Sequence, residues 1–360
     1  MTTDAIDATD GPGTADGPGR ALADPSPRSA LTALDVAALA PGSRLWPTGQ
    51  QITLVHGEQR AVVTEVGATL RGYRVGTRPV VEAFPADELP AGCHGQLLAP
   101  WPNRVRDGRW TWRGRSLQLA HTQPSEANAI HGLVRWALWE VVDESADSVS
   151  LEVVVGGQQG WPFPFRVRAD YALDALGLSC TVTGENLGTE AMPWGFAAHP
   201  YLSVPGGVDA ARVTVPGSTR LRSDERNLPV ERLAVDGPHD LRGGPVLGDR
   251  VLDAAYTDLV RGHGLPATPD RLGLDDPVAV VVEAADGGRT HVVGDSSVRW
   301  FQVFTGDTLP APWTRTAVAV EPMTCPPDAL NSGEDLVVLA PGERTSTAWR
   351  IAYQPPEPRA

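Results

Sequence analysis

Apolar and polar residues alternate with a period of two along most of the chain, from Leu45 onward. This alternation is typical of β-strands with one buried face and one exposed face. The clearest runs extend from Phe165 to Leu173 and from Leu176 to Val182, and together they predict a hairpin. Two more hairpins are predicted around Arg113-Gly114-Arg115 and around Asp286-Gly287-Gly288.

Convincing helical stretches of ten or more residues are nearly absent from the chain. The 38 Gly and 33 Pro residues agree with this, because both residue types favour turns over long helices. We therefore predict an all-β protein with many short strands, folded as a large sandwich or barrel.

The first 42 residues have a different composition, rich in Asp, Thr, Ala, Gly and Pro. A segment of this kind cannot bury enough apolar surface to offset the entropy lost on ordering. We expect a disordered N-terminal extension over residues 1–42, followed by one β-domain over residues 43–356.

The formal net charge of −14 at pH 7 limits the range of partners. Negative charge repels nucleic-acid phosphates and anionic lipids, so we expect neither nucleic acid nor a membrane as a partner. No apolar run approaches the roughly 18 residues of a membrane helix. The three cysteines are widely spaced, and the N-terminus lacks the basic start and apolar core of a signal peptide. We expect a cytoplasmic protein, a monomer or homodimer, that binds a small molecule.

His199 and Glu321 occur in similar local sequences. Each follows small residues on the same face of a predicted strand, and each is followed directly by a proline, which limits further pairing. An unpaired carboxylate is expensive to bury, so Glu321 at the end of an apolar strand indicates a function. The alternatives are a structural histidine and a buried ion pair between Glu321 and Arg104 or Arg315.

Three further residues have the chemistry of a binding site. Arg104 lies between prolines and a strand, and its planar donors suit hydroxyl or carboxylate groups. His131 precedes Gly132, where the backbone can turn sharply and direct the imidazole into a cleft. Asp253 lies between apolar residues and can face a cavity. Each also has a structural interpretation, as a solvent-exposed arginine, a capping histidine and an aspartate in a turn.

A histidine and a glutamate together can open a sugar ring. Opening a hemiacetal removes a proton from the anomeric hydroxyl and adds one to the ring oxygen. A carboxylate with a pKa of about 4.3 can take the first proton, and an imidazolium with a pKa of about 6.5 can give the second. A neighbouring carboxylate raises the protonated fraction of the imidazole. Reclosure on the other carbonyl face inverts the anomeric centre without a cofactor or metal.

At these residues, from about Leu45 to Tyr353, the chain resembles the aldose 1-epimerase (galactose mutarotase) family. The matching motifs, in chain order, are Gly67-Ala68, Asn103-Arg104, His131-Gly132, His199-Pro200-Tyr201, Leu252-Asp253, Gln302 before Phe304-Thr305-Gly306, and Glu321-Pro322 with Pro327-Asp328-Ala329-Leu330-Asn331. The resemblance implies a large antiparallel β-sandwich of the galactose mutarotase type. It also implies that His199 is the general acid and Glu321 the base, with the sugar bound by Asn103, Arg104, His131, Asp253 and Gln302.

The chain departs from the family pattern at three places. Met323 replaces a glutamine, Leu133 replaces a second glycine, and Pro193-Trp194-Gly195-Phe196 replaces a more polar approach to His199. These departures indicate a divergent bacterial-type branch and leave the sugar open.

Three other functions remain as alternatives. One is a hexose-6-phosphate 1-epimerase that uses Arg71, Arg104 or Arg106, and another is a non-catalytic sugar-binding protein on the same fold. A glycoside hydrolase needs two carboxylates flanking a bond, and the sequence shows one strong candidate.

Overall fold

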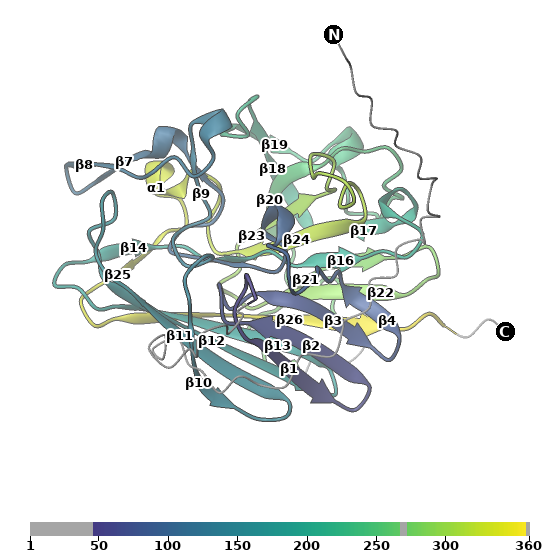
Figure 1. Ribbon diagram of the computed structural model, residues 1–360. Coiled ribbons are helices and arrows are strands. Elements are labelled where there is room, and N and C mark those ends of the chain that lie inside the picture. Colours follow the sequence, from purple (N-terminus) through teal and green to yellow (C-terminus); the bar gives the residue numbers. More distant parts are fainter. Residues whose placement is uncertain (1–45, 267–271, 358–360) are drawn as a thin grey trace, which may run out of the picture.

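The computed structural model describes residues 46–266 and 272–357. Nearly all regular structure in this part of the chain is β-strand, and every strand pairing in it is antiparallel (Figure 1). Two large sheets enclose one core, so the predicted antiparallel β-sandwich is confirmed. The predicted extension over residues 1–42 lies outside the described residues, and its boundary with the β-domain stays a prediction.

The larger sheet has twelve strands. Its main path runs through β1 (Gln51–His56), β2 (Gln59–Thr64), β3 (Leu70–Val75), β4 (Arg78–Val81), β16 (Tyr201–Ser203), β24 (Ala317–Met323), β23 (Trp300–Phe304), β20 (Asp253–Leu259), β18 (Gly217–Ser223) and β19 (Pro229–Ala234). The short strands β5 (Leu97–Leu98) and β15 (Ala197–Ala198) pair with each other, and β15 also pairs with β24.

The smaller sheet has eight strands. In spatial order they are β10 (Glu140–Glu144), β11 (Ser148–Val155), β12 (Phe165–Asp174), β13 (Gly177–Asn186), β26 (Arg344–Gln354), β22 (Arg289–Gly294), β21 (Val278–Glu283) and β17 (Arg212–Thr214). Three two-stranded ribbons pair β6 (Arg104–Val105) with β9 (Ala129–Ile130), β7 (Arg109–Trp112) with β8 (Arg115–Gln118), and β14 (Met192–Trp194) with β25 (Val337–Leu339).

Helices are short throughout the described residues. They are α1 (Ala329–Ser332) and the 3₁₀ turns η2 (Ala91–Cys93), η3 (Arg106–Gly108), η4 (Pro124–Glu126), η5 (Val208–Ala210) and η6 (Gly237–His239). In the part of the chain that the structure describes, no helix has the length and apolar character needed to cross a bilayer.

All three predicted hairpins are present, as β7–β8, β12–β13 and β21–β22. The β7–β8 turn places Arg113 and Gly114 at φ 47° and 80°, as a two-residue hairpin loop requires. One detail of the prediction is wrong: Leu176 lies in the β12–β13 turn, because the tight loop uses the residue that alternation assigned to the strand.

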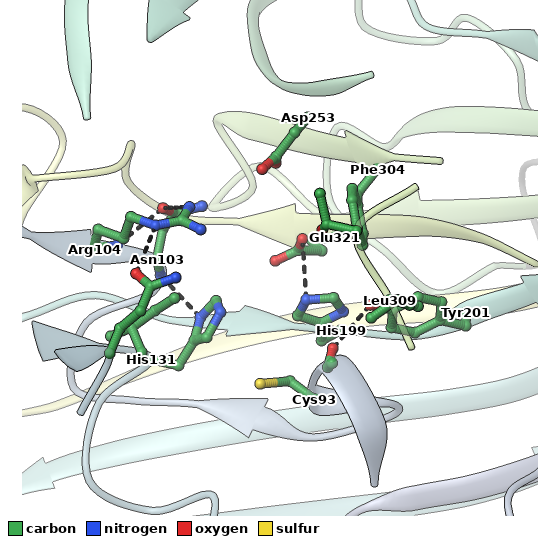
Figure 2. A pocket seen from close by; sticks show the side chains of 14 residues that line it. Cys93, Asn103, Arg104, His131, His199, Tyr201, Asp253, Phe304, Leu309 and Glu321 are labelled. Carbon is green, nitrogen blue, oxygen red and sulfur yellow. Dashed lines mark hydrogen bonds and ion pairs between the residues drawn. The ribbon is translucent and has the colours of Figure 1, made fainter. Parts of the chain in front are cut away.

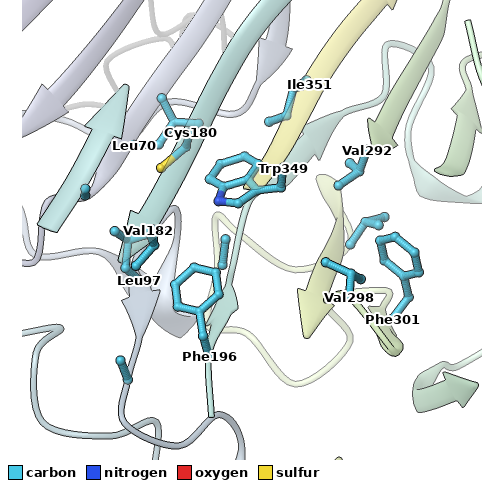
Figure 3. Close-up of a cluster of buried hydrophobic side chains, with 14 of the residues drawn as sticks. Leu70, Leu97, Cys180, Val182, Phe196, Val292, Val298, Phe301, Trp349 and Ile351 are labelled. Carbon is cyan, nitrogen blue, oxygen red and sulfur yellow. The ribbon is translucent and has the colours of Figure 1, made fainter. Parts of the chain in front are cut away.

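The core between the two sheets joins residues that are distant in the sequence (Figure 3). Cys180 of β13 lies opposite Trp349 of β26 in the smaller sheet. These buried side chains share one cluster with Leu70 of β3, Phe196 and Phe301 of β23. One face of the larger sheet therefore packs on the core, and the opposite face is directed away from it.

Candidate active site

Alternation along β24 separates the core from the candidate site. Val318 and Val320 belong to the main core, whereas Ala317 and Ala319 belong to a small cluster on the opposite face with Tyr201. Glu321 has the parity of the two alanines and is directed to that opposite face. The same alternation in β20 and β23 brings Asp253 and Gln302 to this side of the sheet, where Gln302 is paired in register with Glu321.

A cavity of about 230 Å³ lies on this face of the larger sheet (Figure 2). It is smaller than the pockets of about 300–1,000 Å³ that hold drug-sized ligands, and its size suits a small polar molecule. Six of the seven sequence-predicted residues line it: Asn103, Arg104, His131, His199, Asp253 and Glu321. The seventh, Gln302, lines a small recess that shares Asn103, Arg104 and Asp253 with the cavity.

His199 and Glu321 are in direct contact inside the cavity. The Nε2 atom of His199 lies 3.3 Å from Oε1 of Glu321, and the two residues are only 5% and 2% exposed. The structure thus brings together the two residues that the sequence analysis assigned to proton transfer (Figure 2). Arg315, considered as an alternative partner of Glu321, instead pairs with Asp209 and Asp307.

One local prediction about this pair is wrong. Glu321 does not end its strand, because β24 continues through Pro322 to Met323. The Tyr201 ring, Phe304 and Leu309 pack against the small residues Ala317 and Ala319. Small side chains at these positions therefore accommodate an aromatic wall of the cavity.

Burial shifts the pKa values of His199 and Glu321 in opposite directions. It lowers the pKa of His199 to about 3, and the neighbouring His94 adds to this effect. It raises the pKa of Glu321 well above the usual carboxyl range, with Asp253 adding to the shift and Arg104 opposing it. The expected net rise in the His199 pKa is therefore not found. Burial favours a neutral imidazole and a neutral carboxyl, whereas direct contact favours the ion pair, and both arrangements contain one shared proton.

His131 faces His199 from the end of β9. The two rings meet edge to face at 5.6 Å. The backbone N–H of Asn103 donates to Nδ1 of His131 at 3.2 Å, so a neutral His131 carries its proton on Nε2. Burial lowers the pKa of His131 well below its ordinary value, which agrees with the neutral form.

The backbone around His131 depends on Gly132, which has a φ of +66°. A Cβ atom at this position would lie 2.0 Å from the Ala99 carbonyl oxygen. Close approach of two backbone segments therefore requires glycine here.

Arg104 is held at the cavity wall by its neighbours. Its Nε donates to Oε1 of Gln123 at 2.9 Å, and its Nη1 donates to Oδ1 of Asn103 at 3.3 Å. No carboxylate of the described residues forms an ion pair with Arg104, so its remaining donors are available to a ligand.

Three buried polar atoms near the cavity lack a hydrogen-bond partner among the described residues. They are Nδ1 of His199, Oε2 of Glu321 and Oε1 of Gln302. The amide Nε2 of Gln302 is already used, because it donates to Asp253. Unpaired buried polar atoms are costly, so their convergence at one place indicates a site for a polar ligand.

Sequence reasoning missed several cavity residues. Tyr201 was part of a matching motif but had no assigned role, and Cys93 and Leu309 come from loops without a periodic pattern. Trp194 is a core residue that packs against Phe165, whereas Trp136 is 46% exposed and does not line the cavity. In the described part of the chain, no cluster of three His, Cys, Asp or Glu side chains is arranged to hold a metal ion.

Comparisons with known proteins identify a matching family and several similar proteins. The sequence model of a family described as aldose 1-epimerase matches residues 50–352. The uncharacterized Escherichia coli K12 protein YihR is 31% identical over 304 residues, covering 82% of this chain and 91% of YihR. The fold is similar to that of galactose 1-epimerase from Lactobacillus acidophilus NCFM, with a TM-score of 0.70 and 17% identity over 85% of this chain and 95% of that one. A galactose mutarotase-like protein from Clostridium acetobutylicum has a TM-score of 0.72 and 19% identity, again over 85% and 95% of the two chains.

Proposed function

Because the chain belongs to the aldose 1-epimerase family, we propose that it interconverts the α and β anomers of a free hexose. The observation that carries this proposal is the 3.3 Å contact between His199 and Glu321 at a small polar cavity. Binding alone does not need a shared proton, whereas ring opening does.

In the proposed reaction Glu321 takes the proton of the anomeric hydroxyl while His199 gives a proton to the ring oxygen. The ring C–O bond breaks and a carbonyl group forms at the anomeric carbon. After rotation about the adjacent C–C bond, the same proton transfers run in reverse and close the ring on the other face. The pair holds one proton before and after the cycle, so no cofactor takes part.

The remaining residues supply hydroxyl recognition in this proposal. Arg104 and Nε2–H of His131 donate to sugar oxygens, whereas the carboxylate of Asp253 and Oε1 of Gln302 accept from sugar hydroxyls. Asn103 acts through its neighbours, because its side chain contacts Arg104 and its backbone contacts His131.

The cavity favours a free sugar over a phosphorylated one. Of the three arginines considered for a phosphate, Arg71 is buried and donates to the Phe84 carbonyl, and Arg106 lies close to Asp224 and Asp328. Arg104 alone among them lines the cavity. One arginine is enough for hydroxyl groups, whereas phosphate recognition usually combines several donors.

The test is an anomer-resolved NMR exchange assay with glucose, galactose and glucose 6-phosphate. We expect accelerated exchange of at least one free hexose, and a loss of this acceleration in His199→Asn and Glu321→Gln. Faster exchange of the phosphate alone would favour the hexose-phosphate epimerase. Calorimetric binding of sugar without accelerated exchange would favour the non-catalytic binding protein.

A further inference from the structure

Three nearly parallel rings connect the catalytic histidine to a second buried histidine. The Tyr201 ring lies 5.1 Å from the His199 ring, with 9° between their planes. The same tyrosine lies 3.7 Å from the His94 ring, with 7° between their planes. The Tyr201 hydroxyl donates to the Gly92 carbonyl at 2.8 Å, which fixes the orientation of the middle ring.

Both ring nitrogens of His94 contact oxygen atoms. Nε2 lies 2.9 Å from Oε2 of Glu82, and Nδ1 contacts the carbonyl oxygen of Ala91. A carbonyl and a carboxylate accept hydrogen bonds, so satisfying both requires a donor on each nitrogen. The geometry of this ring, which is only 1% exposed, thus matches that of an imidazolium between two acceptors. The Trp313 ring, tilted at 5.2 Å, also packs against it.

We propose that His94 is a positioning residue for His199. As an imidazolium fixed by Glu82 and the Ala91 carbonyl, it sets the plane of the catalytic imidazole through Tyr201 and supplies a fixed positive charge behind it. This inference rests on the proposed function, because it concerns how His199 transfers protons. It gives a role to a residue that matches no motif of the family resemblance.

The charge of His94 acts directly on the protonation of His199. Its field is the second cause, after burial, of the lowered His199 pKa. The other titratable or charged groups around His199 are Glu321 from β24, Tyr201 from β16, His131 after β9, Arg104 from β6, Cys93 from η2, and Arg135. His94 differs from them in having a carboxylate partner that does not line the cavity, so its charge persists when the proton on the catalytic pair moves.

Two variants separate the charge from the ring. His94→Phe removes the charge of His94 and keeps a ring against Tyr201, whereas His94→Ala removes both. His94→Phe should move the acid limb of the kcat profile to higher pH by about one unit, because a cation that opposes protonation of His199 is lost. His94→Ala should also lower kcat about tenfold or more at the plateau, because the imidazole plane is no longer held.

His291→Ala is the matched control, because His291 is another buried histidine that contacts one backbone carbonyl and lies away from the cavity. It should leave the pH profile and kcat unchanged. An unchanged acid limb in His94→Phe would overturn the inference.

The protonation of His94 can also be measured directly on the unmodified protein. Nitrogen-15 NMR of the unmodified protein at pH 7 should show one buried histidine with both ring nitrogens protonated, assigned by its loss in His94→Phe. A neutral His94 would overturn the inference, even if the protein is an active epimerase. Absence of sugar turnover by the unmodified protein would instead overturn the proposed function, while the His94 signal would still be measurable.

Discussion

The backbone N–H of Asp328 donates to the carbonyl of Arg104 at 2.8 Å, although the two residues lie near opposite ends of the β-domain sequence. The Asp328 carboxylate then accepts from the backbone N–H of Arg106 at 2.9 Å and from the side chain of Asn331 at 2.7 Å. Asp328 thus holds the backbone on both sides of Val105. Through these contacts Asp328 supports strand β6, which carries Arg104 at the cavity.

Replacing Asp328 should therefore weaken sugar binding more than the chemical step. In Asp328→Ala the backbone after β6 loses the side-chain acceptor of the Arg106 N–H, so the segment that carries Arg104 is held less firmly, while the contacts of Arg104 with Gln123 and Asn103 remain. We expect KM to rise about tenfold with a smaller change in kcat, because the proposed contact of Arg104 with sugar hydroxyls would be the same in the substrate and in the transition state. Steady-state kinetics by polarimetry would measure both constants. Asp249→Ala, at an exposed position, is the control, and an unchanged KM in Asp328→Ala would contradict this role.

Gly132 and Gly114 provide a matched pair of glycine substitutions. Both have positive φ, at +66° and +80°, so alanine is strained at each by about 1–2 kcal/mol. Only at Gly132 does the new Cβ meet backbone atoms, whereas nothing lies within 4 Å at Gly114. We expect Gly132→Ala to lower the free energy of unfolding more than Gly114→Ala does, and also to reduce activity by displacing His131. Denaturant unfolding of both variants checks this, and equal losses of stability would show that the close contact relaxes without cost.

The strand pattern of this protein was predictable because one face of each strand packs on the core. Phe165 to Leu173 alternates buried and half-buried residues along β12, as its sequence alternation indicates. The catalytic candidates were also predictable, since His199 and Glu321 are polar residues in apolar strand contexts. The contributions of loops were not predictable, because Cys93 ends a 3₁₀ turn that has no periodic signal and His94 follows it. The position of His94 depends on its contact with Tyr201, which is distant in the sequence.

Electrostatics was the other property that the sequence did not reveal. Reference pKa values predicted an ionised Glu321 and a protonated His199, whereas both side chains are buried by residues from several distant segments. Burial depends on the completed fold, so its opposite effects on the two groups follow only from the three-dimensional structure.

His199 and Glu321 should act as a unit in mutational tests. His199→Asn and Glu321→Gln should each lower kcat by about 10²–10⁴-fold. The kcat of the double variant should be little lower than that of the less active single variant, because one proton relay is lost in every case. Glu65→Gln is a suitable control, since Glu65 is a buried carboxyl outside the cavity. Losses that multiply in the double variant would indicate two independent contributions.

The pH dependence of kcat/KM should report the single proton shared by His199 and Glu321. The form of the pair that holds one proton is lost as the pH falls through the pKa of His199, because a second proton then binds and no base remains. It is also lost as the pH rises through the pKa of Glu321, because no acid remains. Since burial lowers the first pKa to about 3 and raises the second, the acid limb should lie below 4.5, the ordinary carboxyl value, and the alkaline limb should belong to Glu321.

The residual activity of Glu321→Gln, corrected for buffer-catalysed mutarotation, should then keep the acid limb and lose the alkaline one. An alkaline limb that persists in this variant near 6.5, the ordinary histidine value, would assign it to His199 and contradict the shared-proton scheme.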